Sequence, residues 1–378
     1  MKRKLLILGT RGIPAKHGGF ETFCEQLSLF LIARDWLVTV YCQEQGRGSI
    51  SESSWCGVRR IHIPVPHAGP RGTITFDWKA TRHAMSQEGL ALTLGYNTAL
   101  FNLLFRMKGK VNVINMDGVE WHRDKWGAIA KVWFWLNEGF GCRVANHLIA
   151  DHPSIKTHLT RRVSDEKITM IPYGARAVEA ADIAALSAFD LVPNGFVSVI
   201  ARPEPENSVL EIVRAFAQKK RGKKLVLLGD YHLSGNPYHR SVRDAASDEV
   251  IFPGAIYDKR VVDALRFYGS LYVHGHTVGG TNPSLVEALG AGSAVLAHDN
   301  RFNRWVAGSA SEFFEDEASC AAKLDSLLQD EAKLSTMRRV SRERFQNMFT
   351  WDSVLTQYEK MLSEFPAKVE GTTSTNLL

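Results

Sequence analysis

The sequence predicts an α/β protein built from two doubly wound domains, and three observations support that prediction. Its 378 residues exceed the size at which one hydrophobic core usually keeps growing, so two domains are expected. Short apolar runs alternate with longer amphipathic runs, which is typical of helices packed around a mostly parallel sheet. The same alternation starts again in the second half, after a Pro-Asn-Gly cluster at 193–195 that is typical of a linker.

In the first half, each short apolar run predicts a buried strand, and most of the segments between them are expected to be helical. The first helix is expected at 20–33. Phe20, Phe23 and Leu27 recur there at helical spacing and so predict one apolar face. The strands expected in this half are 4–9, 37–42, 60–65, 90–95, 111–116 and 147–150.

The second half repeats this logic. Its expected strands are 196–201, 224–228, 250–252, 270–274 and 294–297, and its expected helices are 208–219, 259–267, 283–290 and a stretch beyond 316. We therefore expect an N-terminal Rossmann-like domain at 1–190, a C-terminal one at 195–350, a last helix at 351–365 and a disordered tail at 366–378. In such sheets, ligands bind at the carboxyl ends of the strands, so we expect the two domains to face each other across a cleft.

Composition and charge exclude some function classes. The net charge is +6 and the sequence pI is about 9.0, so an anionic membrane surface or a phosphorylated ligand is a possible partner. The sequence has no long Lys/Arg run of the kind that would favour nucleic acid. The five cysteines are odd in number and widely spaced, as expected of free thiols in a reducing, cytoplasmic compartment. No apolar stretch has the length of a membrane span, and the short apolar run at the start is a strand rather than a signal peptide.

The segment 272–292 carries the strongest local signal for a binding site. Asn282 is expected to cap a helix that begins at Pro283, and the positive end of that helix would attract an anion. Gly279 and Gly280 would let a ligand approach the backbone closely. Glu287, one turn further, would accept hydrogen bonds from sugar hydroxyls. A plain turn with a surface glutamate is the alternative.

Two further loops follow predicted strands. The loop 10–19 contains Gly18 and Gly19 and opens directly into a helix, so it would cradle a phosphate or serve only as a flexible turn. Its spacing does not fit the GxGxxG pattern of dinucleotide-binding dehydrogenases. Arg202 follows the strand 196–201. Its guanidinium would form bidentate hydrogen bonds to a diphosphate there, or else a surface salt bridge.

The segment 115–126 combines carboxylates with aromatic rings. A sugar stacks its CH face on aromatic rings while its hydroxyls hydrogen-bond to polar groups, so this composition favours a sugar site. The alternative is a helix start held by salt bridges. The residues that follow, 129–136, are strongly apolar and favour a core position, with a contact to an anionic bilayer as the alternative. The candidate residues are Asp117, Glu120, Trp121, His122, Arg123 and Trp126.

Absent motifs narrow the chemistry. The sequence contains no D-x-D, the motif that commonly holds a metal ion against a sugar-nucleotide diphosphate. It also lacks GxxxxGK[ST], GxSxG and HExxH, so P-loop, α/β-hydrolase and zincin activities have no support. We therefore expect no cofactor and no metal site.

Taken together, these segments resemble the retaining GT-B glycosyltransferases of glycosyl transferases group one, family four. The segments 10–21 and 116–126 resemble more narrowly its bacterial rhamnosyltransferase-like subgroup, which assembles capsule, O-antigen and exopolysaccharide. The resemblance extends from Lys4 to about Phe365. It implies two facing Rossmann-like domains, an acceptor site on the first, a nucleotide-sugar site on the second, and a C-terminal helix that crosses back.

The resemblance also implies roles for individual residues. Gly18 and Gly19 match the loop that contacts donor phosphate or sugar, and Arg202 matches a diphosphate contact. Glu287 matches the second glutamate of the E-x7-E motif, which binds ribose, and the base would lie near 252–257, at Gly254. The expected donor-binding residues are Gly18, Gly19, Arg202, Asn207, Gly254, Gly279, Gly280, Thr281, Asn282 and Glu287.

Three positions depart from the family pattern. Gly279 stands where the first glutamate of E-x7-E would lie, Asn207 where a lysine usually follows the arginine, and Asp117 where the N-domain histidine lies near the reacting centre. We expect Asp117, Glu120 and Arg202 to be catalytic, with Lys16 assisting at the phosphate. We expect Trp121, His122 and Arg123 to bind the acceptor.

The sequence therefore predicts a metal-independent retaining hexosyltransferase. Its donor would be a nucleotide-diphosphate sugar such as dTDP-rhamnose, and its acceptor a saccharide or a polyprenyl-linked glycan. A peripheral contact with the cytoplasmic face of the inner membrane is expected. A sugar-nucleotide 2-epimerase on the same fold and a non-catalytic nucleotide-sugar-binding assembly protein are the alternatives.

Overall fold

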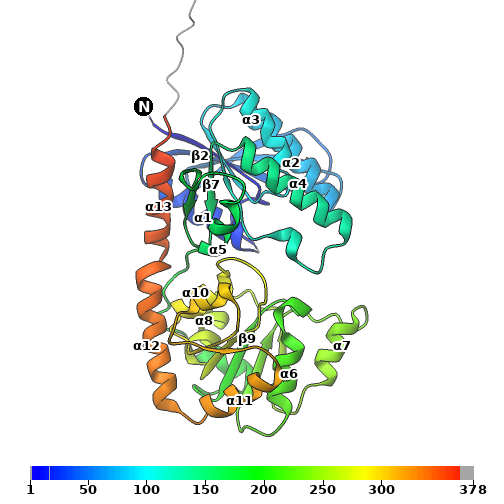
Figure 1. The fold of residues 1–378 in the computed structure, drawn as a ribbon, viewed down its shortest axis with the longest axis vertical. Coiled ribbons are helices and arrows are strands. Elements are labelled where there is room, and N and C mark those ends of the chain that lie inside the picture. Colours follow the sequence, from blue (N-terminus) through cyan, green and yellow to red (C-terminus); the bar gives the residue numbers. More distant parts are fainter. Residues whose placement is uncertain (1, 17, 367–378) are drawn as a thin grey trace, which may run out of the picture. The chain divides into compact units, whose positions relative to one another are not determined.

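The computed structural model describes residues 2–16 and 18–366 and divides the chain into two compact units (Figure 1). The first unit contains Met1–Ile171 and Leu355–Leu378, and the second contains Pro172–Val354. Apart from Pro366, the predicted tail at 366–378 lies outside the described residues.

The first unit is built on an eight-stranded sheet with the order β3-β4-β2-β1-β5-β6-β7-β8. Every pairing is parallel except that of β3 with β4. The strands β2, β4 and β3 lie on one side of β1, and β5 to β8 lie on the other. The topological switch point of this sheet is therefore at β1. The strands are β1 (Lys4–Leu8), β2 (Leu37–Gln45), β3 (Ser51–Trp55), β4 (Val58–Val65), β5 (Leu90–Leu94), β6 (Asn112–Asn115), β7 (His147–Ala150) and β8 (Ile168–Met170).

The central strands of this unit are buried along their whole length because helices cover both faces of a parallel sheet. All five residues of β5 and all four of β6 are buried. The α-helices that begin in this unit are α1 (Gly19–Ile32), α2 (Gly69–Ser86), α3 (Leu103–Met107), α4 (Ala128–Val144) and α5 (Pro153–Leu159). Its 3-10 helices are η1 (Ala99–Asn102), η2 (Glu120–His122) and η3 (Asp165–Lys167).

The second unit holds a six-stranded, fully parallel sheet with the order β11-β10-β9-β12-β13-β14. This is the strand order of the dinucleotide-binding Rossmann fold, and its switch point lies between β9 and β12. The strands are β9 (Phe196–Ile200), β10 (Lys224–Leu228), β11 (Val250–Gly254), β12 (Leu271–His274), β13 (Val295–His298) and β14 (Glu312–Phe314).

Amphipathic helices cover this second sheet. They are α6 (Val209–Ala217), α7 (Pro237–Asp244), α8 (Lys259–Tyr268), α9 (Pro283–Gly290), α10 (Arg301–Ala307), α11 (Glu317–Leu327) and α12 (Glu331–Met348). The 3-10 helices η4 (Ile183–Phe189) and η5 (Pro205–Asn207) complete the unit.

The last helix, α13 (Trp351–Ser363), starts in the second unit and ends in the first. Tyr358 is buried there, and its hydroxyl accepts a hydrogen bond of 2.8 Å from Asn115 Nδ2. Its ring lies 4.6 Å from that of Phe23, and Glu359 pairs with Arg34 at 3.2 Å. The chain therefore returns to its N-terminal unit through this helix.

The predicted fold class is confirmed: the protein is α/β, with two Rossmann-like doubly wound units and a returning C-terminal helix. Three strands were not expected. β3 is polar and exposed at the sheet edge, and β8 and β14 have three residues each, so none of them forms a long apolar run.

The segment that follows Ile171 belongs to the second unit, although we expected the first domain to extend to residue 190. Leu186 and Leu191 form one buried cluster with Phe196 and Val226 of the second sheet. The composition of 189–195 is that of a linker, but Leu191 of this segment packs in the core of the second unit, and the boundary between the units lies after Ile171.

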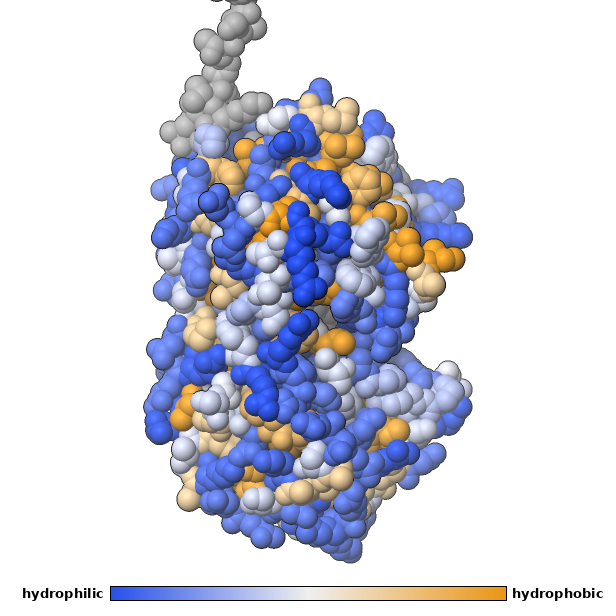
Figure 2. All heavy atoms as spheres, in the orientation of Figure 1, coloured by the Kyte–Doolittle hydropathy of each residue, from blue (hydrophilic) through white to orange (hydrophobic). Residues whose placement is uncertain are grey.

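The apolar run at 129–136 was expected in the core, but much of it is exposed. Of the run at 129–136, Phe134 is buried, whereas Ile129, Val132 and Trp135 are exposed on α4. Figure 2 shows apolar side chains gathered over the part of the N-terminal unit where Figure 1 labels α2, α3 and α4. No helix in the described part of the chain is long and apolar enough to span a membrane.

Candidate functional site

In the second unit, the loops that follow β9 and β12 flank the switch point and pack on each other. Thr277 donates from its N–H and its hydroxyl to the carbonyl oxygen of Glu206, at 2.9 and 3.0 Å. Gly275 lies so close that an added Cβ would be 2.2 Å from the carbonyl oxygen of Asn207. Only a glycine fits there, so the two loops form one rigid rim at the point where doubly wound sheets bind ligands.

The helix α9 begins at this rim, with the predicted cap. Asn282 Oδ1 accepts from the N–H of Ser284 at 3.1 Å, and Pro283 is the first helical residue. The Ser284 hydroxyl lies 2.6 Å from the Tyr272 hydroxyl and donates to the carbonyl of Ile200 at 2.9 Å. The positive end of α9 is therefore fastened to both β9 and β12.

Gly279 of this loop has open space beside it. Gly279 has φ 135°, and no heavy atom lies within 4 Å of a Cβ added there. Gly280 is partly exposed and Thr281 is buried. Gly254, at the end of β11, has φ 86° and likewise has open space around an added Cβ. Gly279 and Gly254 therefore favour glycine by backbone conformation and leave room for a ligand.

Arg202 and Asn207 lie in the loop after β9 and have different environments. The Arg202 side chain is 68% exposed and lies 3.5 Å from Glu204 Oε1, so its guanidinium is open to an anionic ligand. Asn207 is buried, and its Nδ2 donates to the carbonyl of Arg202 at 2.8 Å. In this structure Asn207 shapes the loop that presents Arg202; a direct contact of its amide with the donor stays a prediction.

Glu287 lies on the second turn of α9 and is held by an ion pair. Its Oε2 is 2.5 Å from the guanidinium of Arg266, whose side chain is 7% exposed, while Glu287 itself is 37% exposed. The buried arginine orients the carboxylate, and its exposed edge can still accept from hydroxyl groups.

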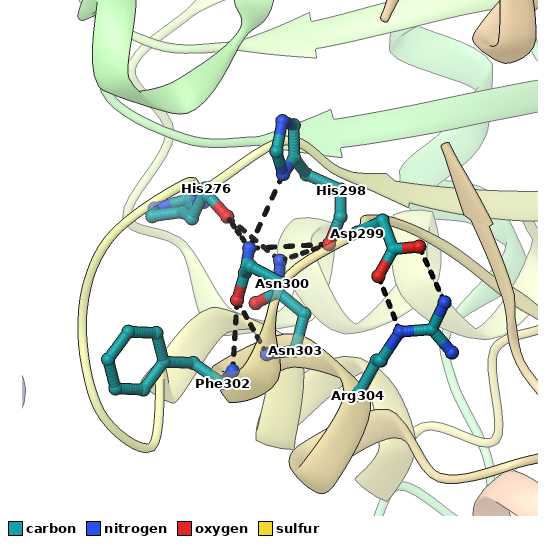
Figure 3. Close-up of polar contacts among 7 residues, drawn as sticks. All are labelled: His276, His298, Asp299, Asn300, Phe302, Asn303 and Arg304. Carbon is teal, nitrogen blue, oxygen red and sulfur yellow. Dashed lines mark hydrogen bonds and ion pairs between the residues drawn. The ribbon is translucent and has the colours of Figure 1, made fainter. Parts of the chain in front are cut away.

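A pair of asparagines fastens the loop after β12 to the end of β13 (Figure 3). Asn300 Nδ2 donates to the carbonyls of His276 and His298 at 3.0 and 3.3 Å. Asn303 Nδ2 donates to the same two carbonyls at 2.8 Å each. We call Asn300 and Asn303 the amide clamp. Sequence reasoning missed it, although an Asp-Asn pair directly after a strand is a readable N-cap signal.

Two histidines stack beneath the same loop. The rings of His274 and His276 lie 4.3 Å apart and are nearly parallel, at 5°. His274 is buried, and burial, with the nearby His276 and Arg266, lowers its pKa well below the ordinary value. His274 is therefore neutral, and its ring packs against that of His276 in the loop.

In the first unit, the loop after β1 leads into α1. Gly18 is the N-cap residue with φ 93°, and Gly19 is the first residue of the helix. Lys16 is exposed, and Glu25 Oε2 accepts from the N–H of Ala15 at 2.6 Å. The loop is thus tied to its own helix, and its glycines stand at the helix start, as predicted.

Asp117 follows β6 in a conformation that non-glycine residues rarely adopt. Its φ is 48°, and its N–H donates to Asn115 Oδ1 at 2.9 Å. Burial, with the nearby carboxylates of Asp151 and Glu120, raises the pKa of Asp117 to about 7. A strained backbone and a raised carboxyl pKa at the end of a parallel strand are typical of functional sites.

Glu120 is already engaged by its neighbours. Its Oε1 pairs with Arg123 at 2.8 Å, its Oε2 accepts from Trp126 Nε1 at 3.0 Å, and its N–H donates to the Tyr96 hydroxyl at 2.8 Å. The helix start held by salt bridges, which the sequence left open as an alternative, is therefore present. Glu120 shapes the loop, and a chemical role for it stays a prediction.

Trp121 is anchored from beneath by Glu138 of α4, a residue that sequence reasoning missed. Trp121 Nε1 donates to Glu138 Oε2 at 2.9 Å, and the ring of the exposed His122 lies 3.9 Å from that of Trp121. Burial opposes ionisation of Glu138, but hydrogen bonds from His158 and Trp121 and the charge of Arg162 hold its pKa below the ordinary value. The buried carboxylate thus fixes the orientation of the indole ring.

The structure therefore brings the predicted residues together in two sets. Asp117, Glu120 and Trp121 lie at the carboxyl end of the first sheet, with Tyr96 and Asp151 added by the fold. Arg202, Asn207 and the start of α9 lie at the switch point of the second sheet. Within the described residues, no three His, Cys, Asp or Glu side chains group in a way that could hold a metal ion.

Solved structures with the same fold are glycosyltransferases. Sucrose-phosphate synthase from Thermosynechococcus elongatus matches with a TM-score of 0.81 at 19% identity, over 96% of this chain and 99% of that one. HepE from Anabaena in complex with UDP matches at 0.73 and 15% identity, over 96% and 100%. A trehalose-phosphate synthase from Burkholderia xenovorans in complex with glucose-6-phosphate matches at 0.71 and 10% identity, over 96% and 100%.

These likenesses show that the chain has the GT-B fold. Residues 2–176 match a family model described as a domain of unknown function (DUF1972). No curated protein matches the chain in a sequence search.

Proposed function

We propose that this protein is a glycosyltransferase that moves a sugar from a nucleotide-diphosphate donor to a saccharide or lipid-linked glycan acceptor. The observation that supports this most is the rim of the second sheet, where an exposed Arg202 and the N-terminus of α9 lie at the switch point. Proteins of the same fold have been solved in complex with UDP, UDP-glucose or glucose-6-phosphate.

The nucleoside diphosphate is the leaving group of this reaction. The bond between the anomeric carbon and the diphosphate oxygen breaks, and negative charge develops on the diphosphate. Arg202, the backbone at Gly280 and Thr281 and the positive end of α9 would stabilise that charge, with Lys16 of the first unit assisting. Because these groups supply positive charge and the sequence has no D-x-D motif, we propose transfer without a metal ion.

Glu287 and Gly254 would hold the nucleoside. The carboxylate of Glu287 is oriented by Arg266 and would accept hydrogen bonds from the ribose hydroxyls. Gly254 leaves open space at the end of β11, where the base would lie. Asn207 would contribute by holding the carbonyl of Arg202.

The acceptor would bind beside Asp117. Trp121 and His122 offer a ring face for stacking, and Arg123 adds a polar group. We propose that the acceptor hydroxyl attacks from the face that the leaving group vacates, so the anomeric configuration is retained, and that its proton passes to the departing diphosphate. With a pKa of about 7, Asp117 would accept a hydrogen bond from that hydroxyl or from the donor sugar when ionised.

The donor we propose is a 6-deoxy sugar nucleotide such as dTDP-rhamnose, used in the assembly of cell-surface polysaccharide. Gly279 stands at the loop position where a carboxylate would bind a sugar hydroxyl, and the space around it is open. A sugar with fewer hydroxyl groups fits such a site. A lipid-linked acceptor would bring the protein to the cytoplasmic face of the inner membrane.

A panel of purified sugar nucleotides, incubated with a lipid-linked acceptor extract, tests these proposals. Transfer from dTDP-rhamnose with retention supports them, and turnover of UDP-glucose without any turnover of dTDP-rhamnose would end the deoxysugar assignment. Conversion of the donor to its 2-epimer in the absence of acceptor indicates an epimerase instead. Donor binding with no turnover of any acceptor indicates a non-catalytic protein.

The role of Arg202 has its own test. Arg202→Ala is expected to raise the KM for the donor by about 10- to 100-fold, because a charge-assisted hydrogen bond is worth about 1.5–3 kcal/mol. Arg214→Ala is the control, since Arg214 is an exposed arginine on α6 away from the switch point. Equal KM values for the two variants would remove Arg202 from the donor site.

A further inference from the structure

The helices α2, α3 and α4 expose an unusual amount of apolar surface. Fifteen large apolar side chains are exposed in the described part of the chain, and nine of them lie on these three helices, so the exposure is concentrated there. Contiguous apolar patches of this kind mark interaction sites, because a free monomer rarely leaves them in water. The nine residues, which we call the α2–α4 surface, are Ile74, Trp78, Leu103, Met107, Ile129, Val132, Trp135, Leu136 and Phe140.

The outer face of α4 is the clearest part of this surface. Ile129, Val132, Leu136 and Phe140 follow one another at spacings of three and four residues, and they are 89%, 57%, 43% and 36% exposed. That spacing places them on one stripe of the helix, and the exposed Arg143 continues it. The opposite side of α4 is buried and includes Phe134, Asn137 and Glu138, so the outward stripe is not the face that packs on the core.

The three helices form one continuous surface because η1 lies between them. The ring of Trp78 on α2 packs against that of Phe101 in η1 at 5.2 Å. The N–H of Leu100 in η1 donates to Asn137 Oδ1 of α4 at 3.0 Å. The helix α3 follows η1 directly in the chain.

Basic residues accompany the apolar ones, and the acidic side chains of these helices turn inward. Only two carboxylates occur on the three helices. Asp77 is partly buried and accepts from the Thr98 hydroxyl at 2.8 Å, and Glu138 is 1% exposed and paired with Arg162. The basic residues on the same helices are Arg71, Lys79, Arg82, Arg106, Lys131 and Arg143.

We propose that the α2–α4 surface docks this protein on an anionic lipid bilayer. Apolar side chains interleaved with lysine and arginine are what binds at the boundary between headgroups and acyl chains. A second copy of the chain is a poorer partner. A two-fold dimer through this surface would bring the same basic side chains face to face with no exposed carboxylate on the helices to balance them.

Docking of α4 would place the proposed acceptor residues across this helix from the lipid, within about 10 Å of it. η2 packs against α4 through the hydrogen bond from Trp121 to Glu138, and the segment after η2 packs on it through the rings of Trp126 and Phe134, 5.1 Å apart. A lipid-linked glycan would then reach Trp121 without leaving the membrane surface. This consequence rests on the proposed function, whereas the docking itself does not.

Sedimentation of the full chain with vesicles tests the docking, without donor or acceptor present. Vesicles of phosphatidylglycerol and phosphatidylcholine are compared with vesicles of phosphatidylcholine alone, at low and at high salt. We expect binding to the anionic vesicles, weakened by salt. Ile129→Ser with Val132→Ser and Leu136→Ser should weaken that binding by on the order of ten-fold or more, since each buried methylene contributes.

Two further variants separate the causes. The triple variant Arg71→Gln, Arg106→Gln and Arg143→Gln should bind anionic vesicles more weakly by on the order of ten-fold or more, because three positive charges are removed from the surface. The matched control changes Ile183, Val192 and Leu233 to serine; these side chains are 55%, 64% and 40% exposed in the second unit, and binding should be unchanged. Circular dichroism checks that every variant is folded.

Three results would overturn the proposal. One is absence of sedimentation with either kind of vesicle at low salt. Another is equal binding by the wild type and the triple serine variant of α4. The third is a concentration-dependent dimer in analytical ultracentrifugation that this variant dissolves while vesicle binding stays unchanged, which would assign the surface to a second copy of the chain.

Discussion

Asp117 illustrates how the site depends on single residues. A carboxyl group has an ordinary pKa of 3.8, but desolvation and the nearby carboxylates of Asp151 and Glu120 raise the pKa of Asp117 to about 7. The same residue holds a left-handed backbone conformation, with φ 48°. Both features cost stability, and strain of this kind is typical of functional sites, so we propose that Asp117 takes part in substrate binding.

Asp117→Asn is expected to lower kcat by about 10- to 100-fold, because the amide keeps the shape but loses the negative charge that orients a hydroxyl. Activity of the wild type should rise as the pH rises through about 7, as Asp117 ionises. This rise should be absent from the variant. Asp124→Asn is the control, since Asp124 is a fully exposed aspartate seven residues away. Unchanged kcat in Asp117→Asn would exclude Asp117 from the mechanism.

The stability of the protein should change with pH for the same reason. The folded-state pKa of Asp117 lies above its unfolded value, so the folded protein binds this proton more tightly. Its contribution to stability is present below about pH 4 and is lost as the pH rises toward 7. Thermal unfolding of the wild type and Asp117→Asn at pH 5 and pH 7.5 measures this. The difference in Tm between the variant and the wild type should shift in favour of the variant when the pH is raised from 5 to 7.5.

The amide clamp acts on the donor loop through Asn303. Asn303→Asp keeps the size of the side chain but replaces a donor to the carbonyls of His276 and His298 by an acceptor. We expect a loss of stability of about 1–3 kcal/mol and a higher KM for the donor, with a smaller change in kcat. A purely structural role would lower the Tm and leave KM unchanged. Asn347→Asp, at an exposed position on α12, is the control.

At the scale of elements, the site depends on where strands end. β9 and β12 are neighbours in the second sheet although 70 residues of chain lie between Ile200 and Leu271, and their loops meet at the switch point. The parallel arrangement brings the loops of separate strands to the same edge. The two loops approach this closely because Gly275 has no Cβ between them.

Gly275→Ala tests this packing. An added Cβ would lie 2.2 Å from the carbonyl oxygen of Asn207 and 2.8 Å from Ile212 Cδ1, so the loops must separate. We expect a stability loss of about 1–3 kcal/mol and weaker donor binding, since Arg202 and α9 would no longer keep their spacing. Gly235→Ala is the matched control, because nothing lies within 4 Å of a Cβ added there. Calorimetry of nucleoside diphosphate binding distinguishes the two variants.

At the scale of the whole molecule, the last helix supports the candidate catalytic loop. The hydroxyl of Tyr358 on α13 accepts from Asn115 Nδ2, and Asn115 Oδ1 in turn accepts from the N–H of Asp117. Tyr358 and Asn115 are both buried and stand 243 positions apart in the chain. The returning helix therefore determines the conformation of a residue in the first half of the sequence.

Tyr358→Phe should destabilise the protein by about 1–3 kcal/mol, because the buried amide of Asn115 loses its acceptor. It should also lower kcat, as Asp117 loses part of its support, while the KM for the donor stays unchanged. Thr356→Ser, which alters an exposed residue on the same helix, should leave both the Tm and kcat unchanged. A drop in Tm without any effect on kcat would show that α13 supports the fold but not the site.

The sequence by itself determined the fold class and much of the candidate donor half. Apolar runs of strand length and amphipathic runs between them predict parallel sheets, because burial on both faces requires that pattern. The cap at Asn282 and Pro283 was predicted and is confirmed, since capping depends on residues that are neighbours in the chain.

Only the tertiary structure decided the rest. The amide clamp, the pair of Arg266 with Glu287 and the support of Asp117 by Tyr358 join residues that are far apart in the sequence. The outward position of the apolar stripe on α4 was decided in the same way, because periodicity places a stripe on one face without saying what covers that face. Local propensity follows the chain, whereas burial, pKa values and docking surfaces follow from which distant segments pack together.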